Sequence, residues 1–459
     1  MELAGKRVLV VGMARSGVAA SELLSKMGAI VKVSDNRPMD QLKKEIRTLE
    51  GLGVALETGA HCLDSFLAAS LIVVSPGVPL RIPELQEAQR AGIEIISELE
   101  LAFRFLKGKI IAITGTNGKT TTTALVGEIM KTTILPVLVG GNIGTPLSSL
   151  VGSSTPETFS VVEVSSFQLE AAPSFRPDVA VILNVTPDHI DRHGDFRGYV
   201  ETKLNILRNQ LASDMAVLNL EDPILSGLNQ SVRAKTFWFS NRREVEDGTG
   251  FDGEQLVFKK RGNREVIVPG RSVLLRGSHN LENVAAAVTA SRLAGVSATG
   301  INGAISRFKG VEHRLEWVAE IEGVSFYNDS KATNVDATIK ALLAFDSGLV
   351  LILGGRDKGG DYTVLRPLVR QRVKTILLLG EASGKIQSQL EGIVPMHRVK
   401  SMQEAVNIGF KLADRGETVL LAPACASFDM FLDYEDRGQA FKGAVNSLRV
   451  VNAMGVNEI

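Results

Sequence analysis

The stretch that decides the predicted fold is Ile110-Ile-Ala-Ile-Thr-Gly-Thr-Asn-Gly-Lys-Thr-Thr121. Residues 110–114 are a short apolar run that is typical of a strand buried on both faces, and a glycine loop and a helix-like run follow it. Such a loop wraps backbone N–H groups around phosphate oxygens, with Lys119 reaching the terminal phosphates and the Thr120 hydroxyl ligating Mg²⁺. The usual motif has its first glycine where this chain has Ile113, so we predict a shortened phosphate loop.

The same pattern of an apolar run, a glycine and a helix-like stretch recurs elsewhere in the chain. It appears at Arg7–Gly12, Leu349–Gly354 and Thr375–Gly380. Continuous apolar runs of this length predict parallel sheets and an α/β fold. The 459 residues are about three times the usual domain length of ~150 residues. We therefore predict three domains, with boundaries at 1–107, 108–310 and 311–459.

Two further segments of the middle domain carry local signals. Two short, largely apolar segments, residues 255–258 and 265–268, flank Arg261-Gly-Asn-Arg264 and predict a surface hairpin. An alanine-rich stretch after Asn283 predicts a buried helix.

The first apolar run leads into a turn that resembles a dinucleotide-binding motif. Gly12-Met-Ala-Arg-Ser-Gly17 has Ala14 at the position where a glycine lets the backbone approach a pyrophosphate. Asp35 ends the second predicted strand, where an acid that binds ribose is expected. The turn predicts a Rossmann-like domain with a nucleotide-like ligand, and Ala14 weakens the interpretation as an NAD-dependent oxidoreductase.

Composition excludes several classes of protein. Lys plus Arg total 51 and Asp plus Glu total 51, which argues against a protein that wraps nucleic acid. The two cysteines, Cys62 and Cys425, exclude a disulfide framework and a four-cysteine zinc site. No apolar run approaches ~20 residues, and the N-terminus lacks the long apolar core of a signal peptide. We expect a soluble cytoplasmic protein.

Acidic and histidine side chains follow two more apolar runs of the middle domain. Phe159-Ser-Val-Val-Glu163 ends in an acid where a metal-binding carboxylate sits at a sheet's carboxyl edge. Val181-Ile-Leu-Asn-Val185 leads into a loop with Asp188, His189, Asp191 and His193. Beside a phosphate loop, this pattern favours a Mg-nucleotide site.

Two nucleotide-type sites on one chain favour an ATP-driven joining reaction on a nucleotide-tagged substrate. Hydride transfer does not require a phosphate loop, and a mechanical ATPase usually has no second nucleotide pocket. From the residues alone, a NAD-dependent oxidoreductase and a non-enzymatic ATP-driven switch remain the alternatives from other classes.

Longer segments resemble the Mur ligases through nearly the whole chain. They are the Gly115 loop, Val164-Ser-Ser-Phe-Gln-Leu-Glu170, Asn184-Val-Thr-Pro-Asp-His-Ile-Asp191, Gly277-Ser-His-Asn-Leu-Glu-Asn283, Glu312-His-Arg314, Asn328-Asp-Ser-Lys-Ala-Thr-Asn334 and Ala422-Pro-Ala-Cys-Ala-Ser-Phe-Asp429. The wider family with folylpolyglutamate synthetases shares the first motifs, and the last two are more similar to the branch that adds D-glutamate. The resemblance implies N- and C-terminal Rossmann-like domains around a central phosphate-loop α/β domain. It also implies a ligase that joins D-glutamate to UDP-N-acetylmuramoyl-L-alanine through an acyl phosphate and a tetrahedral intermediate. Another Mur ligase or a folylpolyglutamate synthetase-like ligase is the nearest alternative.

The resemblance also implies which residues hold ATP and two Mg²⁺ ions. ATP contacts fall on Gly115, Thr116, Asn117, Gly118, Lys119, Thr120, Thr121, Asn280, Asn283, Arg314 and Asp329. Metal ligands fall on Thr120, Glu163, His189 and Lys203, the last as a carbamate, because an ammonium cannot ligate Mg²⁺. Asp329 and Lys331 line the acyl-phosphate site. Without the family, Lys203 would be interpreted as a surface helix lysine and Asn280 as a helix cap.

Substrate contacts are implied in the same way. The uridine nucleotide is expected on Ser16, Asp35, Arg37 and Gly77, and the muramoyl end on Asn142, Ser165 and Gln168. The amino acid is expected on Thr333, Lys358, Ser427 and Tyr434, the last often Phe in relatives. Cys425 has no matched base, which favours packing over a nucleophilic role. The isolated His61 and His397 are interpreted as structural, and the protein is expected to be a monomer.

Overall fold

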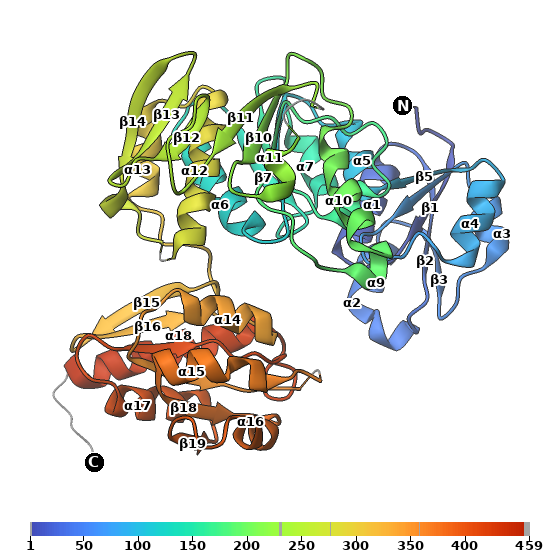
Figure 1. Cartoon of the computed structure of the whole chain (residues 1–459). Helices are drawn as coiled ribbons and strands as arrows, with labels where there is room; N and C mark the ends of the chain where they lie inside the picture. The colour runs from blue at the N-terminus through green and yellow to red at the C-terminus, as the bar shows by residue number, and fades with distance from the viewer. Residues whose placement is uncertain (1, 229–231, 276, 358, 454–459) are drawn as a thin grey trace. The chain divides into compact units, whose positions relative to one another are not determined.

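The computed structural model describes residues 2–228, 232–275, 277–357 and 359–453 (Figure 1). The chain forms two compact units, which are described separately. Unit 1 consists of residues 1–273 and 282–306, and unit 2 of residues 274–281 and 307–459.

The first sheet of unit 1 is parallel and has the strand order β3-β2-β1-β4-β5. Its strands are β1 (Arg7–Val11), β2 (Ile30–Asp35), β3 (Ala55–Thr58), β4 (Leu71–Val74) and β5 (Glu94–Ser97). The helices are α1 (Arg15–Lys26), α2 (Lys43–Glu50), α3 (Leu63–Leu67), α4 (Pro83–Arg90) and α5 (Glu98–Phe103). This order is that of a Rossmann-type half, in which the chain reverses direction across the sheet beside β1.

The second sheet of unit 1 has the order β14-β13-β12-β11-β10-β9-β6-β8-β7. Its strands are β6 (Lys109–Thr114), β7 (Val137–Gly141), β8 (Phe159–Glu163), β9 (Val179–Ile182), β10 (Met215–Asn219), β11 (Lys235–Phe239), β12 (Gly248–Phe251), β13 (Gln255–Lys260) and β14 (Asn263–Pro269). The helices along this stretch of chain are α6 (Lys119–Met130), α7 (Leu147–Leu150), α8 (Ser166–Leu169), α9 (Ile190–His193), α10 (Phe196–Leu204), α11 (Pro223–Ser226), α12 (Ser278–Leu293) and α13 (Ala298–Ile305).

The strands from β7 to β12 pair in parallel, whereas β13 and β14 form an antiparallel hairpin at the sheet's edge. The predicted hairpin is therefore confirmed. The chain leaves β6 toward β7 on one side and later adds β9 on the other side of β6. Ligands of open α/β sheets bind outside the carboxyl ends of strands at such a reversal. The glycine loop after β6 lies at this point.

Unit 2 contains a third sheet with the order β15-β16-β20-β17-β18-β19. Its strands are β15 (Glu316–Ile321), β16 (Val324–Asn328), β17 (Leu349–Leu353), β18 (Val373–Leu379), β19 (Met396–Val399) and β20 (Thr418–Leu421). The helices are α14 (Val335–Leu343), α15 (Arg366–Arg372), α16 (Ser383–Leu390), α17 (Met402–Leu412) and α18 (Tyr434–Ala453). Only the β15–β16 pairing is antiparallel among the strands described here.

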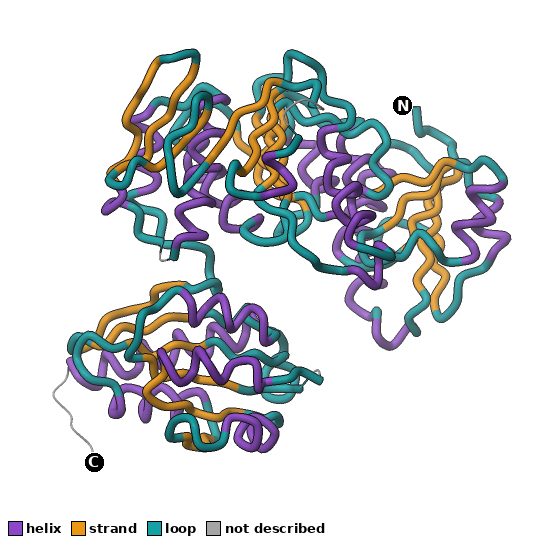
Figure 2. The backbone as a smooth tube through the Cα atoms, viewed as in Figure 1, coloured by secondary structure: helices purple, strands orange, loops and turns teal. Residues whose placement is uncertain are grey.

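Figure 2 shows the strands of each sheet flanked by helices. One apolar core in unit 1 includes Val10 of the first sheet and Ala112 of the second. A polar contact also links α5 to α7, because the Ser148 amide donates a 2.6 Å hydrogen bond to the buried carboxyl of Glu98. In unit 2, separate cores on the third sheet contain Leu351 and Ile352, neighbours that face opposite sides of β17. The α/β fold class is confirmed, and the boundaries at 107/108 and 310/311 stay predictions.

No helix in the described ranges is both long enough and apolar enough to cross a membrane.

Candidate active site

The phosphate loop of unit 1 joins β6 to α6 through Gly115–Gly118. Gly118 has φ of +85° at the helix N-cap, and a Cβ there would lie 2.2 Å from Asn283 Oδ1. The Lys119 ammonium donates to the carbonyl oxygens of Gly115 and Thr116 at 2.8 and 2.9 Å. The loop is therefore closed around its own lysine, and a side chain at residue 118 would disturb it.

Residues of the loop after β9 and of α10 form hydrogen bonds with the phosphate loop. Asn184 accepts from the Asn117 amide at 2.8 Å and donates to its carbonyl at 3.2 Å. The Thr116 hydroxyl lies 3.1 Å from both the Thr186 carbonyl and the Tyr199 hydroxyl. Asn184 and Tyr199 were not assigned a role from the sequence, although Asn184 stands in a quoted motif.

Glu163 lies at the carboxyl end of β8, where the sequence predicts a carboxylate. Its side chain is buried at 1% exposure, and Asn142 Nδ2 donates to its Oε1 at 3.1 Å. In the sheet, Glu163 is in register with Ile113 of β6 and Gly141 of β7. The structure thus brings Glu163 and Asn142 together beside the strand that carries the phosphate loop.

His189 has an unusual backbone conformation at the start of α9. Its φ is +52°, and its amide donates to Asp188 Oδ1 at 3.0 Å. Its ring is exposed and lies against Phe167, with 4.8 Å between centroids. Left-handed backbone is uncommon outside glycine and concentrates at functional sites. Of the two other polar residues of this loop, His193 contacts Glu170 and Ser166, and the side chain of Asp191 is not described.

Lys203 is buried, which excludes the alternative that it is a surface helix lysine. It is 1% exposed, and its Nζ donates to the Gly115 carbonyl at 2.8 Å, the same oxygen that Lys119 contacts. Its ammonium also lies over the Tyr199 ring, 4.7 Å from the centroid. Burial, and then the nearby Lys119 charge, lower the pKa of Lys203 to about 7.

A cavity of about 540 Å³ lies at the carboxyl end of the first sheet. It is lined by five of the residues predicted to hold the acceptor substrate, namely Ser16, Asp35, Arg37, Gly77 and Asn142. Because Asn142 also contacts Glu163, this residue connects the cavity to the phosphate-loop region.

Asp35 is fully engaged by the protein. Its Oδ1 accepts from the Arg37 amide and Nε at 2.9 Å, and its Oδ2 accepts from the Met13 amide and Arg37 Nη2 at 2.7 Å. Burial alone would raise the pKa of Asp35, but these hydrogen bonds lower it below its usual value. Asp35 therefore orders the glycine turn and Arg37. It is not an unoccupied ribose acceptor, which removes the main support for an NAD-dependent oxidoreductase.

Ser165 and Gln168 form a capping box at the start of α8. Gln168 Oε1 accepts from the Ser165 amide at 3.0 Å, and the Gln168 amide donates to Ser165 Oγ at 3.3 Å. Within the described part of the chain, the buried Gln168 Nε2 has no hydrogen-bond partner. The predicted contact of these two residues with the muramoyl end stays a prediction.

Asn280 and Asn283, the predicted adenine contacts, lie three residues apart in α12. The helix begins at Ser278, so Asn280 is inside the helix and is not its N-cap. Thr120 and Thr121, in the first turn of α6, are both half-buried.

In unit 2, Arg314 lies in a tight loop between two residues with left-handed backbone, His313 at φ +64° and Leu315 at φ +44°. Asp329 at the end of β16 accepts from the Leu315 amide at 3.3 Å. Burial raises the pKa of Asp329 to about 7. The loop that carries Arg314 is thus hydrogen-bonded to Asp329.

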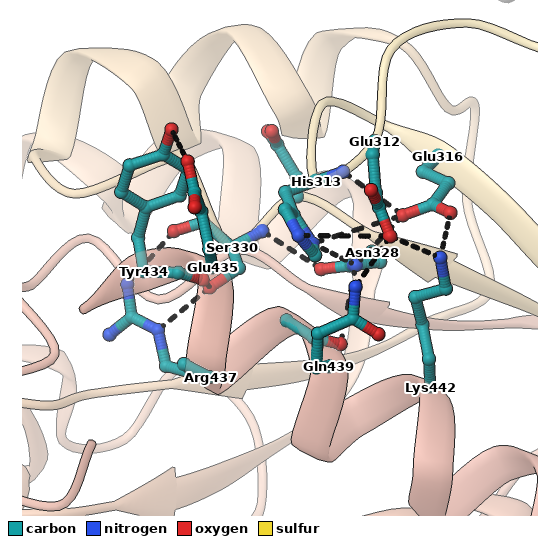
Figure 3. A network of polar contacts seen from close by, with 12 residues as sticks. Glu312, His313, Glu316, Asn328, Ser330, Tyr434, Glu435, Arg437, Gln439 and Lys442 are labelled. Carbon is teal, nitrogen blue, oxygen red and sulfur yellow. Dashed lines mark hydrogen bonds and ion pairs between the residues drawn. The ribbon is translucent and has the colours of Figure 1, made fainter. Parts of the chain in front are cut away.

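A polar network ties the Glu312–Glu316 loop to α18 (Figure 3). The Lys442 ammonium lies 2.7 Å from a carboxylate oxygen of both Glu312 and Glu316. Asn328 Nδ2 donates to His313 Nδ1 and Glu316 Oε2 at 2.9 and 3.0 Å. Glu312, His313 and Glu316 could together surround a metal ion, but the Lys442 ammonium already forms an ion pair with both carboxylates. We interpret the network as a support for Arg314.

Arg437 of α18 joins the two motifs that are most similar to the D-glutamate-adding branch. Its guanidinium is 1% exposed and donates to Ser330 Oγ and Ser330 O at 3.0 and 2.9 Å. It also donates to the carbonyls of Cys425 and Ala426 at 3.1 and 3.3 Å. Arg437 could not be predicted as a site residue, because an arginine inside a helix pattern carries no signal of burial.

The predicted amino-acid contacts are distributed around these loops. Lys331 Nζ lies 3.7 Å from the centroid of the Tyr434 ring, and the Thr333 amide donates to the Lys331 carbonyl at 2.8 Å. Ser427 is 2% exposed, one residue after Ala426. Lys358 lies outside the described residues. Cys425 is buried 3.0 Å from the Tyr362 hydroxyl, and burial raises its pKa to about 11, so its thiol stays protonated.

Comparison with known proteins places these features in one family. Residues 6–97 match the MurD-like N-terminal domain of Mur ligases, residues 113–291 the Mur ligase middle domain, and residues 313–425 the glutamate ligase domain of Mur ligases. The chain is 51% identical to a UDP-N-acetylmuramoylalanine–D-glutamate ligase of Acidobacterium capsulatum, over 97% of both chains. It is 48% identical to one of Koribacter versatilis, over 98% of this chain and 99% of that protein.

Solved structures agree on the fold. UDP-N-acetylmuramate–alanine ligase MurC from Thermotoga maritima superposes with a TM-score of 0.60 at 19% identity, over 96% of this chain and 100% of that chain. MurF from Acinetobacter baumannii superposes with a TM-score of 0.59 at 18% identity, over 97% and 91% of the two chains. With three domain matches and full-length relatives at about half identity, this chain belongs to the Mur ligase family.

Proposed function

We propose that this chain catalyses the ATP-dependent addition of D-glutamate to UDP-N-acetylmuramoyl-L-alanine in peptidoglycan precursor synthesis. The observation that carries this proposal is the 51% and 48% identity to ligases of that name over nearly the whole chain. Full-length similarity at this level also argues against the alternatives of another Mur ligase or a folylpolyglutamate synthetase-like enzyme.

The reaction has two stages, phosphorylation of the acceptor and formation of the amide. A carboxylate oxygen of the acceptor attacks the γ-phosphorus of ATP, and ADP leaves to give an acyl phosphate. The amine nitrogen of D-glutamate then attacks the acyl carbon and forms a tetrahedral intermediate. This intermediate expels inorganic phosphate and loses a proton to become the amide. The protein's contribution is to position the reactants and to neutralise oxygen charges.

In this proposal the phosphate loop holds the nucleotide. The backbone amides of residues 115–121 face its phosphates, and Lys119 exchanges its contacts with loop carbonyls for the β- and γ-phosphates. Asn280 and Asn283 hold adenine through their amide groups, and Arg314 approaches the γ-phosphate. Asp329 and Lys331 stand at the acyl-phosphate site as a hydrogen-bonding group and a cation.

Two Mg²⁺ sites are proposed, with ligands from Thr120 and Glu163 at one site and from His189 and Lys203 at the other. Oxygen donors of this kind fit Mg²⁺, and the His189 imidazole would add a nitrogen ligand at the second site. The ions would neutralise charge on phosphate and carbonyl oxygens. The buried carboxylate of Glu163 at the end of β8 is the observation of this structure that fits a cation.

Lys203 fits this site as a carbamate. Its lowered pKa of about 7 leaves a large fraction of neutral amine at neutral pH. The amine nitrogen can then attack CO₂ and lose a proton, which replaces a buried cation by an anionic oxygen donor. Carbon-13 NMR of the protein in ¹³C-bicarbonate should show a carbamate signal that Lys203→Arg abolishes, and an unchanged spectrum would contradict the modification.

The uridine-linked acceptor and D-glutamate are assigned to separate groups of residues. The uridine nucleotide lies in the cavity lined by Ser16, Asp35, Arg37 and Gly77, and the muramoyl arm extends past Asn142 toward Ser165 and Gln168. D-glutamate contacts Thr333, Lys358, Ser427 and Tyr434. The proposal includes a cytoplasmic monomer that binds neither nucleic acid nor membrane, and sedimentation velocity tests the monomer.

A product assay tests the amino-acid specificity. The purified chain is incubated with ATP, Mg²⁺, UDP-N-acetylmuramoyl-L-alanine and an equimolar mixture of D-glutamate, L-glutamate, L-alanine and a diamino acid. Mass spectrometry with chiral analysis should find only the D-glutamyl product. A comparable yield of any other adduct would overturn the assignment.

A further inference from the structure

His61 lines the same cavity of about 540 Å³ as Ser16 and Arg37. It lies between β3 and α3, and its ring meets Phe66 edge-on, with 5.5 Å between centroids and 75° between planes. From the sequence this histidine is interpreted as structural. Its position in the cavity raises the question of what its ring nitrogens offer to a ligand.

One ring nitrogen of His61 belongs to a network centred on Glu57. Oε1 of Glu57 accepts from Ser34 Oγ at 2.8 Å and from the Cys62 amide at 2.9 Å. Oε2 accepts from Ser65 Oγ at 2.6 Å and lies 2.9 Å from the Lys32 ammonium. Burial opposes ionisation of Glu57, but these hydrogen bonds outweigh it and lower the pKa to about 2. Glu57 is therefore a carboxylate, which only accepts hydrogen bonds.

The network determines which nitrogen of His61 carries a hydrogen. Ser34 has a single hydroxyl hydrogen, and a 2.8 Å contact with a carboxylate oxygen requires that hydrogen to point at Glu57. The second contact of Ser34 Oγ, 2.8 Å from His61 Nδ1, must then be one in which His61 donates. Neutral His61 is thus held as the Nδ1–H tautomer, with a lone pair on Nε2. Within the described ranges, no protein group forms a hydrogen bond with Nε2.

The carboxylate that lines this cavity, Asp35, is occupied. Each carboxylate oxygen of Asp35 already accepts two hydrogen bonds, from Met13 and Arg37. Ser16, Asn36, Ser75 and Asn142 also line the cavity, and their hydroxyl and amide groups can both donate and accept, whereas Arg37 only donates. Neutral His61 in contrast offers only an acceptor at Nε2, which suits a ligand with a hydrogen-bond donor on its ring.

We propose that His61 is a specificity-determining residue that accepts the N3–H of uracil and so selects uridine nucleotides. This inference rests on the proposed function, in which a uridine nucleotide occupies the cavity. Uracil carries a hydrogen on N3, whereas cytosine has a lone pair there. Because Glu57 and Ser34 hold the hydrogen of the neutral ring on Nδ1, neutral His61 presents no donor at Nε2 to cytosine. Specificity then comes from repulsion of the wrong base as well as attraction of the right one.

Binding of four diphosphates to the full-length chain tests the proposal by calorimetry. The probes are UDP, CDP, N3-methyl-UDP and 2′-deoxy-UDP. The unmodified chain should bind UDP at least about tenfold more tightly than CDP or N3-methyl-UDP, the size expected for one hydrogen bond and an unpaired acceptor. It should bind 2′-deoxy-UDP about as tightly as UDP. A preference against 2′-deoxy-UDP alone would assign His61 to the ribose and overturn the proposal.

His61→Phe keeps the ring and its contact with Phe66 but removes the acceptor. It should weaken UDP binding, strengthen CDP binding because the repelling lone pair is gone, and so abolish the preference of about tenfold. Ser34→Ala frees the tautomer and should reduce the UDP preference by a smaller factor. Cys62→Ser is the matched control, because only its backbone amide enters the network, and it should change nothing.

The outcomes separate this proposal from the proposed function. If His61→Phe and Ser34→Ala both keep the full preference for UDP, the role of His61 is wrong while the ligase assignment stands. If the unmodified chain binds none of the uridine nucleotides, the proposed function fails and this inference with it. Circular dichroism of both variants shows whether a loss of binding reflects unfolding.

Discussion

At the scale of the residue, burial sets the protonation of two groups of opposite charge. It lowers the pKa of Lys203 to about 7 and raises that of Asp329 to about 7. Each side chain thus has both protonation states accessible near neutral pH. Perturbed groups of this kind cluster at functional sites, although structural networks can produce them too.

Asp329→Asn should stabilise the protein in a way that depends on pH. The folded pKa of Asp329, about 7, lies above its usual value of 3.8, so the cost of burying the charge is absent below pH 3.8 and complete above pH 7. Asparagine is neutral throughout. We expect a gain of ~1–3 kcal/mol at pH 8 and a smaller gain at pH 5, together with loss of activity.

Calorimetric melting of both proteins at the two pH values measures this difference. The control is Asp336→Asn, because the Asp336 side chain is 73% exposed and should affect melting little. An equal shift for Asp329→Asn at pH 5 and pH 8 would contradict a burial-raised pKa.

At the scale of the element, α18 orders the loops that are predicted to receive D-glutamate. Arg437 of α18 donates both to Ser330 and to the Cys425–Ala426 backbone, and Ser330 Oγ in turn donates to the Tyr434 carbonyl of the same helix. Lysine cannot reproduce this fork of donors. Arg437→Lys should therefore destabilise the protein by ~1–3 kcal/mol, because buried carbonyls lose their partner, and should raise the KM for D-glutamate more than the KM for ATP.

Steady-state kinetics with each substrate varied in turn checks this prediction. Arg449→Lys is the matched control, because Arg449 lies on the exposed side of the same helix. Equal increases in both KM values, or none, would show that α18 does not order the amino-acid loops.

Strands were the elements best predicted from the sequence, because a strand buried on both faces appears as a continuous apolar run. Phe159–Glu163 coincides with β8, and the predicted run at Arg7–Gly12 overlaps β1. The hairpin at residues 255–269 was also predicted. Its place in the nine-stranded sheet was not, because that depends on the pairing of Trp238 with Gly248, which no local pattern reveals.

Side chains whose role depends on distant partners could not be predicted. Ser34 and Glu57 fix the tautomer of His61. Arg437 finds one partner, Ser330, 107 residues earlier in the chain and another, Cys425, 12 residues earlier. Lys203 shows the converse. Its place in the site followed from the family resemblance, while the burial that explains its chemistry needed the fold.

At the scale of the whole molecule, the balance of 51 basic and 51 acidic residues conceals local charge. Lys119 and Lys203 share the Gly115 carbonyl in unit 1. In unit 2, Arg314 and Lys331 lie in loops and Arg437 lies in α18. We therefore expect the proposed phosphorylated and carboxylated substrates to be bound through the positions of these cations, since the net charge of the chain is zero.

The central claim is that ATP is consumed only to join D-glutamate to the uridine-linked acceptor. The direct measurement is release of inorganic phosphate by the purified chain with ATP and Mg²⁺, with neither substrate, with each substrate alone and with both. We predict sustained release only when UDP-N-acetylmuramoyl-L-alanine and D-glutamate are both present, with one amide formed per phosphate. Sustained release without D-glutamate, or equal release with a different amino acid, would contradict the account.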